Sequence, residues 1–357
     1  MSVFQNALLR ARSLVWLLAV ALGLALPLVA ESKPQANKHP VAAKKKSVTK
    51  TARLRAMRVV PAKPSFGQLS GLHGVGDSLA LKSSVALVLD QDTNEVLFSK
   101  NPQAVLPIAS ITKLMTALVV SEAKQPLDEL LSIGPDDIDT EKGSRSRLQV
   151  GTRLSREEML HLALMASENR AASSLGRHYP GGSVAFVAAM NRKAQVLGMK
   201  DTHYVEPTGL SSRNQSSAND LAVLMREVDK HDLIRQLSTS QHYEVAVGSR
   251  HVNFRNTNGL VRSGEWDIGL QKTGYISEAG RCLVMQAQLS GRKLIMVLLD
   301  SAGKYSRIGD AERIRKWVSD MPPVPHALPA LPAQSAPAPD ADPAPDPAVV
   351  ATAELLA

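Results

Sequence analysis

The chain has a single cysteine among its 357 residues, and only 4% of its residues are aromatic. One thiol cannot form an intramolecular disulfide, although this does not exclude an oxidising compartment. Because Cys282 lies in an apolar run, we expect a buried structural thiol rather than a nucleophile. The nine histidines show no paired spacing such as His-x-x-x-His, and neither zinc-finger spacing nor an aromatic stacking motif occurs. We therefore expect no metal site and no cofactor.

Positive charge is concentrated in one tract. The formal net charge is +9, and residues 31–64 carry ten Lys or Arg against Glu31 alone, so this tract equals the whole excess. A DNA-binding domain would carry its basic residues on the folded part, among its recognition elements. The remainder of the chain is close to neutral, which argues against nucleic acid as a partner.

The N-terminus has the pattern of an export signal. Arg10 and Arg12 precede an apolar run over residues 14–28, and the small residue Ala30 follows before polar sequence begins. The run is short for a bilayer span, so we expect residues 1–30 to be a signal peptide. Leu28 is bulky for the position two before a cleavage residue, which leaves an uncleaved anchor as the alternative.

Composition divides the rest of the chain into three segments. Residues 31–64 are rich in Lys, Ala and Pro and predict a disordered basic linker, which could be weakly attracted to an anionic membrane or wall polymer. Residues 65–321 form the expected working domain. Residues 322–357 repeat Pro, Ala and Asp and predict a disordered tail, since they cannot bury a core.

The working domain predicts strands at both ends and helices between them. An expected hairpin joins residues 85–89 and 95–98, further strands are expected at 270–276, 282–289 and 293–299, and a final helix covers about 310–318. Helix-start patterns occur at Ser110, Ser155 and Ser217, and Asn258-Gly259 predicts a turn. The fold class is therefore α/β (α+β), with one antiparallel sheet built from both chain ends and a helical middle.

Ser-x-x-Lys is a weak motif alone, because it occurs five times, at Ser47, Ser110, Ser121, Ser290 and Ser301. Only Ser110-Ile111-Thr112-Lys113 starts an apolar helix. Residues three apart share a helix face, so Lys113 can reach the Ser110 hydroxyl and take its proton. A lysine with its ordinary pKa of ~10.4 is a poor base unless burial or a second cation lowers that value. Lys272-Thr273-Gly274, the single Lys-[Ser/Thr]-Gly in the chain, offers the second cation on a predicted strand.

Ser-x-Asn is also common, and occurs at Ser99, Ser167, Ser212 and Ser217. Order along the chain and local context favour Ser167-Glu168-Asn169, which follows a predicted helix and precedes the Lys-Thr-Gly. There Ser167 could relay a proton to a leaving amine, and Asn169 could hold a substrate amide.

These three motifs, in this order, are the signature of class A β-lactamases and penicillin-binding proteins. Residues 64–322 resemble the low-molecular-weight D-Ala-D-Ala peptidases (peptidase family S11), particularly at Pro107–Thr116 and Glu206–Leu210. The resemblance implies a penicillin-binding transpeptidase-like fold, with Ser110 as the nucleophile and the backbone N–H groups of Ser110 and Tyr275 receiving the oxyanion. It further implies that Lys272 and Thr273, and Arg307 if it is more than a surface residue, bind the substrate's terminal carboxylate.

The same resemblance orders the possible activities. A short segment between Gly274 and Pro322 leaves no room for the second domain and anchor helix of family carboxypeptidases, so the chain resembles the DD-endopeptidase branch, which cleaves D-Ala-diaminopimelate cross-links. A D-alanyl-D-alanine carboxypeptidase is the alternative. A class A-like β-lactamase fits less well, because Leu210 stands where its loop would have asparagine. A non-catalytic wall-binding or penicillin-sensing protein is disfavoured by the intact motifs. Expected partners are peptidoglycan stem peptides and β-lactam inhibitors, and the expected location is the periplasm, in cell-wall remodelling.

Overall fold

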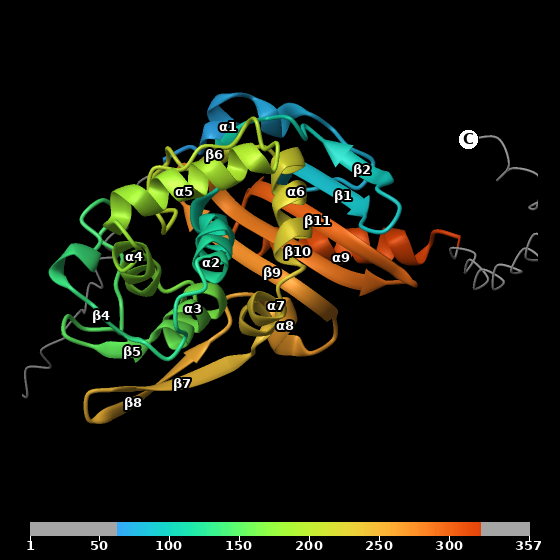
Figure 1. Ribbon diagram of the computed structural model, residues 1–357. Helices are drawn as coiled ribbons and strands as arrows, with labels where there is room; N and C mark the ends of the chain where they lie inside the picture. Colours follow the sequence, from blue (N-terminus) through green and yellow to red (C-terminus); the bar gives the residue numbers. More distant parts are fainter. Residues whose placement is uncertain (1–62, 323–357) are drawn as a thin grey trace, which may run out of the picture. The chain divides into compact units, whose positions relative to one another are not determined.

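The computed structural model describes residues 63–322 (Figure 1). The predicted signal peptide of residues 1–30 lies outside the described residues, as do nearly all of the basic linker and the Pro-rich tail.

A five-stranded antiparallel sheet contains strands from both ends of the described chain, in the order β2–β1–β11–β10–β9 (Figure 1). The first two strands, β1 (Ser83–Asp90) and β2 (Val96–Lys100), form the predicted hairpin. The last three strands are β9 (Asp267–Ile276), β10 (Gly280–Leu289) and β11 (Arg292–Ser301). β1 pairs with β11, for example at Leu87 and Val297, so the two chain ends share one sheet. The predicted fold class is confirmed.

The sheet is covered on both faces, which explains why every residue of β1 is buried. Successive side chains of a strand point to opposite faces. Val85 and Leu87 belong to the large apolar core shared with the middle helices, whereas Ala86 and Val88 belong to a second core with Ile314 of α9 (Ser306–Ser319). A strand buried on both faces reads as a continuous apolar run, as this one does.

Helices fill the middle of the chain. They are α2 (Thr112–Glu122), α3 (Arg156–Met165), α4 (Asn169–Arg177), α5 (Gly182–Val196), α6 (Ala218–Val228) and α7 (Asp232–Thr239). Short elements are α1 (Phe66–Leu69), the 3₁₀ turns at Leu72–Gly74, Ala109–Ile111 and Pro135–Asp137, and the two-stranded pairs β3 (Leu106–Pro107) with β6 (Gln215–Ser216) and β4 (Leu130–Ser132) with β5 (Arg153–Ser155). All residues of α2 from Thr112 to Val120 are buried, Lys113 among them, so this helix lies inside the domain.

Two predicted helix starts are confirmed by their caps. The Ser155 hydroxyl accepts a hydrogen bond from the Glu158 N–H, and the Glu158 carboxylate accepts one from the Ser155 N–H, which completes a capping box. The Ser217 hydroxyl caps α6 through the Asp220 N–H at 3.3 Å.

Three local details differ from the sequence-based expectations. Ser110 lies in a 3₁₀ turn, and the α-helix starts at Thr112. Asn258-Gly259 is not a simple turn, because the Asn258 side chain accepts from the Leu260 N–H and caps a short helix, α8 (Gly259–Ser263). A hairpin of β7 (His242–Val247) and β8 (Arg250–Arg255) precedes it and was not predicted. Within residues 63–322, no helix combines the length and apolar character that crossing a membrane requires.

Candidate active site

Ser110 is held where the helical middle meets the sheet. A Cβ on Gly274 of β9 would lie 2.9 Å from the Ile108 carbonyl oxygen and 3.2 Å from the Ser110 nitrogen, so glycine allows β9 to pass this close. Gly209 is more restrictive, because its φ is +81° and a Cβ there would lie 1.9 Å from the Ala109 oxygen. Two glycines thus let two separate segments pack directly on the backbone of the candidate nucleophile.

The backbone around the site is strained at two positions. Ala109 (φ 47°) and Ser167 (φ 59°) both adopt the left-handed region that favours glycine. Such a conformation costs roughly 1–3 kcal/mol per residue and persists only where the surroundings enforce it. Here one strained residue directly precedes Ser110 and the other is itself the serine of the Ser-x-Asn motif.

Lys113 lies one turn after Ser110 and is fully buried. Its Nζ lies 3.0 Å from Ser110 Oγ and 2.7 Å from Asn169 Oδ1, and it also donates to the Thr208 carbonyl at 2.5 Å. Burial lowers the pKa of Lys113 to about 8, although the charges of Glu206 and Glu168 oppose this. A neutral amine has two hydrogens, which the two carbonyl oxygens can accept, so its lone pair is left facing the Ser110 hydroxyl.

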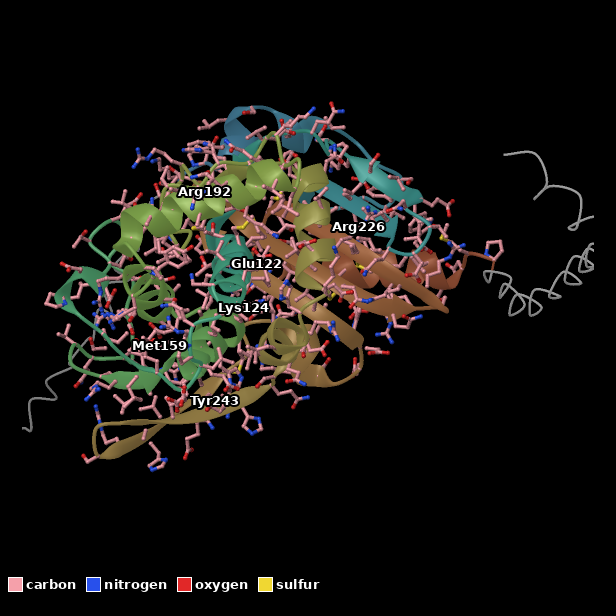
Figure 2. The ribbon with its side chains drawn as sticks, viewed as in Figure 1. Glu122, Lys124, Met159, Arg192, Arg226 and Tyr243 are labelled. Atoms are coloured by element: carbon pink, nitrogen blue, oxygen red, sulfur yellow. The ribbon has the colours of Figure 1, made fainter. Side chains whose placement is uncertain are left out.

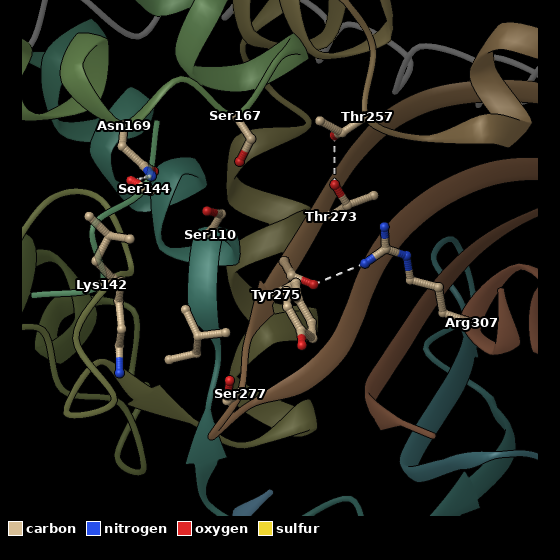
Figure 3. A pocket seen from close by; sticks show the side chains of 13 residues that line it. Ser110, Lys142, Ser144, Ser167, Asn169, Thr257, Thr273, Tyr275, Ser277 and Arg307 are labelled. Carbon is tan, nitrogen blue, oxygen red and sulfur yellow. Dashed lines mark hydrogen bonds between the residues drawn. The ribbon is translucent and has the colours of Figure 1, made fainter. Parts of the chain in front are cut away.

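Ser167, in the loop between α3 and α4, and Asn169, the first residue of α4, line the same cavity (Figure 3). Ser167 Oγ accepts a hydrogen bond from Lys272 Nζ at 2.9 Å. Asn169 accepts from Lys113 through its oxygen and donates through Nδ2 to the Ser144 hydroxyl at 2.9 Å. An amide NH₂ has two hydrogens, so Asn169 keeps one for a substrate carbonyl.

The opposite wall is β9, which carries Lys272, Thr273, Gly274 and Tyr275. Lys272 is fully buried, and its pKa is lowered well below the ordinary value by burial first and then by the charges of Lys113 and Arg307. Thr273 and Tyr275 are two residues apart, so both face the cavity, and both line it. The Ser110 N–H belongs to the first turn of a helix, where N–H groups have no intrahelical acceptor. Together with the Tyr275 N–H it is available for the predicted oxyanion site.

Arg307 lines the cavity from α9. Its Nη1 donates to the Gly274 carbonyl at 2.9 Å (Figure 3) and to the Cys282 carbonyl at 3.2 Å, which fixes the guanidinium beside β9 and β10. Arg307 is therefore not a free surface residue. Cys282 itself is buried, as expected, and burial raises the pKa of its thiol to about 12, so it is not a nucleophile.

The cavity has a volume of about 470 Å³. It brings together Ser110, Ser167, Asn169, Thr273, Gly274, Tyr275 and Arg307, while Lys113 and Lys272 lie buried against it. The sequence interpretation missed several lining residues, which are Lys142, Ser144, Leu210, Thr257, Ile276 and Ser277. Thr257 has the closest link to a predicted residue, because its hydroxyl lies 2.6 Å from that of Thr273 (Figure 3).

Glu206 is a structural carboxylate. Its two oxygens accept hydrogen bonds from the N–H and hydroxyl of Thr208, from the N–H groups of Gly209 and Ser211, and from Nδ2 of Asn214. These bonds shape the loop whose Thr208 carbonyl receives Lys113. A carboxylate engaged by five donors is poorly placed to activate a water, which removes the basis of the β-lactamase alternative.

One group of metal-type side chains occurs among residues 63–322, and it lies apart from the cavity. Glu122, Glu227 and His231 place ligand atoms within 4.8 Å of one another near the end of α2, where Figure 2 labels Glu122. Lys193 donates to both Glu122 and Glu227, at 2.5 and 3.3 Å, so an ammonium already neutralises these carboxylates.

Comparison with known proteins gives consistent results. The family model described as D-alanyl-D-alanine carboxypeptidase matches residues 75–303. The D-alanyl-D-alanine endopeptidase of Pseudomonas aeruginosa is 52% identical over 242 residues, which is 67% of this chain and 77% of that protein. The D-alanyl-D-alanine endopeptidase of Escherichia coli is 44% identical over 279 residues, 77% of this chain and 90% of that protein.

A solved structure shares the fold. The crystal structure of the Streptomyces K15 DD-transpeptidase superposes with a TM-score of 0.62 at 26% identity, covering 67% of this chain and 97% of that one. The family match includes all three motifs, from Ser110 to Gly274, and ends before Arg307. The chain belongs to the D-alanyl-D-alanine carboxypeptidase family, the serine DD-peptidases of family S11.

Proposed function

We propose that this chain hydrolyses D-Ala-containing peptide bonds of peptidoglycan through an acyl-serine intermediate, with D-Ala-diaminopimelate cross-links as its main substrate. The main support for this reaction is the position of Lys113. Its Nζ lies 3.0 Å from Ser110 Oγ, and its side chain is fully buried. A buried amine with a pKa of about 8 is a competent base near neutral pH.

In the acylation step, neutral Lys113 takes the hydroxyl proton as Ser110 Oγ bonds to the D-Ala carbonyl carbon. The resulting oxyanion accepts hydrogen bonds from the Ser110 and Tyr275 N–H groups, which need no reorganisation as charge develops. When the tetrahedral intermediate collapses, the carbon–nitrogen bond breaks and the leaving amine takes a proton from Ser167. The proton that Lys113 gained then passes to Ser167, which returns Lys113 to its neutral form, and Lys272, 2.9 Å from the Ser167 hydroxyl, holds that hydroxyl in place.

In the second step water attacks the acyl-serine ester. The same base accepts a proton from the water, the ester carbon–oxygen bond breaks, and Ser110 recovers its proton. The peptide with a new C-terminal carboxylate then leaves. No group beyond water and the named side chains is required for this balance.

The leaving residue carries a carboxylate, which the second half of β9 can bind. Thr273 lines the cavity, Lys272 precedes it on β9, and Arg307 lines the cavity from α9. Charge-assisted hydrogen bonds are stronger than neutral ones. The part of the site formed by Lys272, Thr273 and Arg307 should therefore bind a free carboxylate better than an amide.

Two relatives named D-alanyl-D-alanine endopeptidase, at 52% and 44% identity, support the cross-link as substrate. A relative named D-alanyl-D-alanine carboxypeptidase, from Bacillus subtilis, is 32% identical over 237 residues. Removal of a terminal D-Ala is therefore the second candidate activity, and it would use the same serine and base.

The proposal places the enzyme in the periplasm, exported by residues 1–30, with residues 31–64 as a basic linker to the domain at 65–321 and residues 322–357 as a disordered tail. The composition of these segments supports this arrangement. The cell wall is then both the location and the substrate, which fits a role in wall remodelling.

The role of Ser110 is tested by intact-mass measurement after incubation with penicillin. The parent should gain one penicilloyl adduct that maps to the peptide carrying Ser110, and Ser110→Ala should gain none and lose all turnover of cross-linked muropeptide. Ser121→Ala, which alters another Ser-x-x-Lys, serves as the matched control and should behave as the parent. An adduct on any other serine would refute the assignment.

A further inference from the structure

A second, smaller cavity adjoins the catalytic one. It has a volume of about 230 Å³, and Tyr275 and Ser277 line both cavities. Its other walls come from the residues that start α1, from the beginning of β10 and from the loop that follows β11. The two cavities therefore meet at the end of β9, where Tyr275 is 54% exposed.

Three cations line this second cavity, which are Lys63, Arg281 and Lys304. The Arg281 guanidinium lies over the Tyr275 ring at 4.5 Å, and the Lys304 ammonium lies 5.2 Å from the Tyr305 ring. Between residues 63 and 322, neither Arg281 nor Lys304 has a carboxylate within ion-pair distance. Two basic side chains without acidic partners beside an open hollow form a site for an anion.

The one carboxylate in the cavity lining does not cancel this charge. Asp300 is buried, and its Oδ2 contacts Ser65 Oγ at 2.9 Å, His73 Nε2 at 3.0 Å and Ser84 Oγ at 3.2 Å. These three contacts all engage Oδ2 and hold the carboxylate in the protein interior, since Asp300 is buried. The charged side chains of the lining that reach solvent are therefore the cations.

A substrate peptide bound along β9 would extend into this second cavity. If Thr273 holds the leaving residue's carboxylate and the Tyr275 N–H holds the oxyanion, the acyl half of the substrate continues toward Ser277. Each residue of an extended strand spans about 3.3 Å, so the residues just before the scissile D-Ala reach the second cavity. In a peptidoglycan stem those residues carry free carboxylates.

We propose that this cavity is a subsite for the carboxylates of the acyl-donor stem peptide, bound by Arg281 and Lys304 after the stem passes Tyr275 and Ser277. The proposal rests on the peptidase function proposed above and specifies how that site selects its substrate. The subsite recognises the donor half alone, and so it serves cross-linked dimers and monomeric pentapeptides equally.

The test is steady-state kinetics of the full chain with Arg281→Gln, Lys304→Gln and the double variant, on stems with free carboxylates and on the same stems amidated before the D-Ala. We expect KM of the double variant to rise about tenfold on the free-carboxylate stem, with kcat unchanged, and each single variant to show part of that rise. On the amidated stem, parent and variants should have equal KM. The difference on the free stem should shrink as salt increases.

Two controls keep the outcome interpretable. Lys200→Gln removes an exposed lysine outside both cavities and should change nothing. Penicillin lacks the stem, so its rate of acylating Ser110 should be the same in all variants, which also verifies folding. An unchanged KM in the double variant, or an equal rise on free and amidated stems, would overturn the subsite.

Failure of the proposed function gives a different result. If every form releases D-Ala from pentapeptides but leaves dimers intact, the endopeptidase activity is refuted. The subsite is still tested in that case, because the pentapeptide presents the same donor stem.

Discussion

The hydroxyl oxygens of Thr257 and Thr273 lie 2.6 Å apart, although Thr257 follows β8 and Thr273 belongs to β9. Thr257 also donates its N–H to the Met165 carbonyl at 3.0 Å, at the end of α3. Thr257 thus connects Thr273 on β9 with the residues that precede the loop carrying Ser167. A hydroxyl that accepts from a neighbouring hydroxyl can turn its own hydrogen toward a ligand, so the pair can present a directed donor to the leaving residue's carboxylate.

Thr257→Val should therefore weaken recognition of the leaving carboxylate without disturbing packing, because valine has nearly the same shape. We expect kcat/KM to fall about tenfold for substrates with a free carboxylate beside the scissile bond, which is the effect of roughly 1.4 kcal/mol. Thr257→Ser keeps the hydroxyl and should recover most of the loss. Kinetics on free and amidated leaving groups measure this, and an equal loss on both would show that Thr257 acts only through packing.

The pKa of Lys113 predicts the pH dependence of acylation. The amine must be neutral to accept the Ser110 proton, and burial lowers its pKa to about 8. The neutral fraction then rises from about one tenth at pH 7 to about nine tenths at pH 9, so the penicillin acylation rate should rise about tenfold over that interval. Lys113→Ala should abolish this rise together with nearly all activity. A rate that is flat from pH 7 to pH 9, or that first rises near the ordinary lysine value of ~10.4, contradicts the assignment.

We expect replacement of Glu206 to lower the free energy of unfolding, and to lower activity only as a consequence of the altered loop. Its carboxylate accepts from Thr208, Gly209, Ser211 and Asn214, and Glu206→Ala would leave these donors without their acceptor. We expect the free energy of unfolding to fall by about 2–4 kcal/mol, with activity lost as the Thr208 carbonyl moves away from Lys113. Denaturant unfolding measures the change. Glu141→Ala, which alters an exposed acid, should stay within about 0.5 kcal/mol, and similar values for the two variants would refute the structural role of Glu206.

The basic linker should act at low ionic strength. Deletion of residues 31–62 should leave turnover of small soluble substrates unchanged and should weaken binding to isolated sacculi or anionic vesicles at low salt. At ~0.1 M ionic strength exposed charges are screened beyond about 10 Å, so the two forms should converge as salt increases. Co-sedimentation measures this binding. Equal binding of the truncated and full chains at low salt would contradict the prediction.

The fold was predictable because its signals are local. The alternation and apolar runs of β1, β10 and β11 identify strands, the serine caps at Ser155 and Ser217 identify helix starts, and the order of these elements implies a sheet shared by both chain ends. The β7–β8 hairpin escaped prediction, because Gly248-Ser249 is a short turn signal between strands that are polar on their exposed positions. Asn258-Gly259 gave an ambiguous signal, since asparagine favours both turns and helix caps.

The residues of the candidate site also fall into those that the sequence could predict and those that it could not. Ser110, Lys113, Ser167, Asn169 and Lys272 could be selected because each belongs to a short motif whose order along the chain is informative. Thr257, Lys142 and Ser144 belong to no motif, and they line the cavity only because the chain returns to it from distant segments. The orientation of Arg307 was also beyond the sequence, because two backbone carbonyls, of Gly274 and Cys282, determine it.

We expect the serine site of this chain to cleave cross-links in preference to terminal D-Ala. The most direct measurement incubates the purified enzyme with defined cross-linked dimers and monomeric pentapeptides at matched concentration and follows the products by mass. The account predicts that dimers are split to monomers faster than pentapeptides lose D-Ala, and that Ser110→Ala does neither. Faster loss of D-Ala from pentapeptides would contradict the endopeptidase assignment, and cleavage of dimers by Ser110→Ala would contradict the serine mechanism itself.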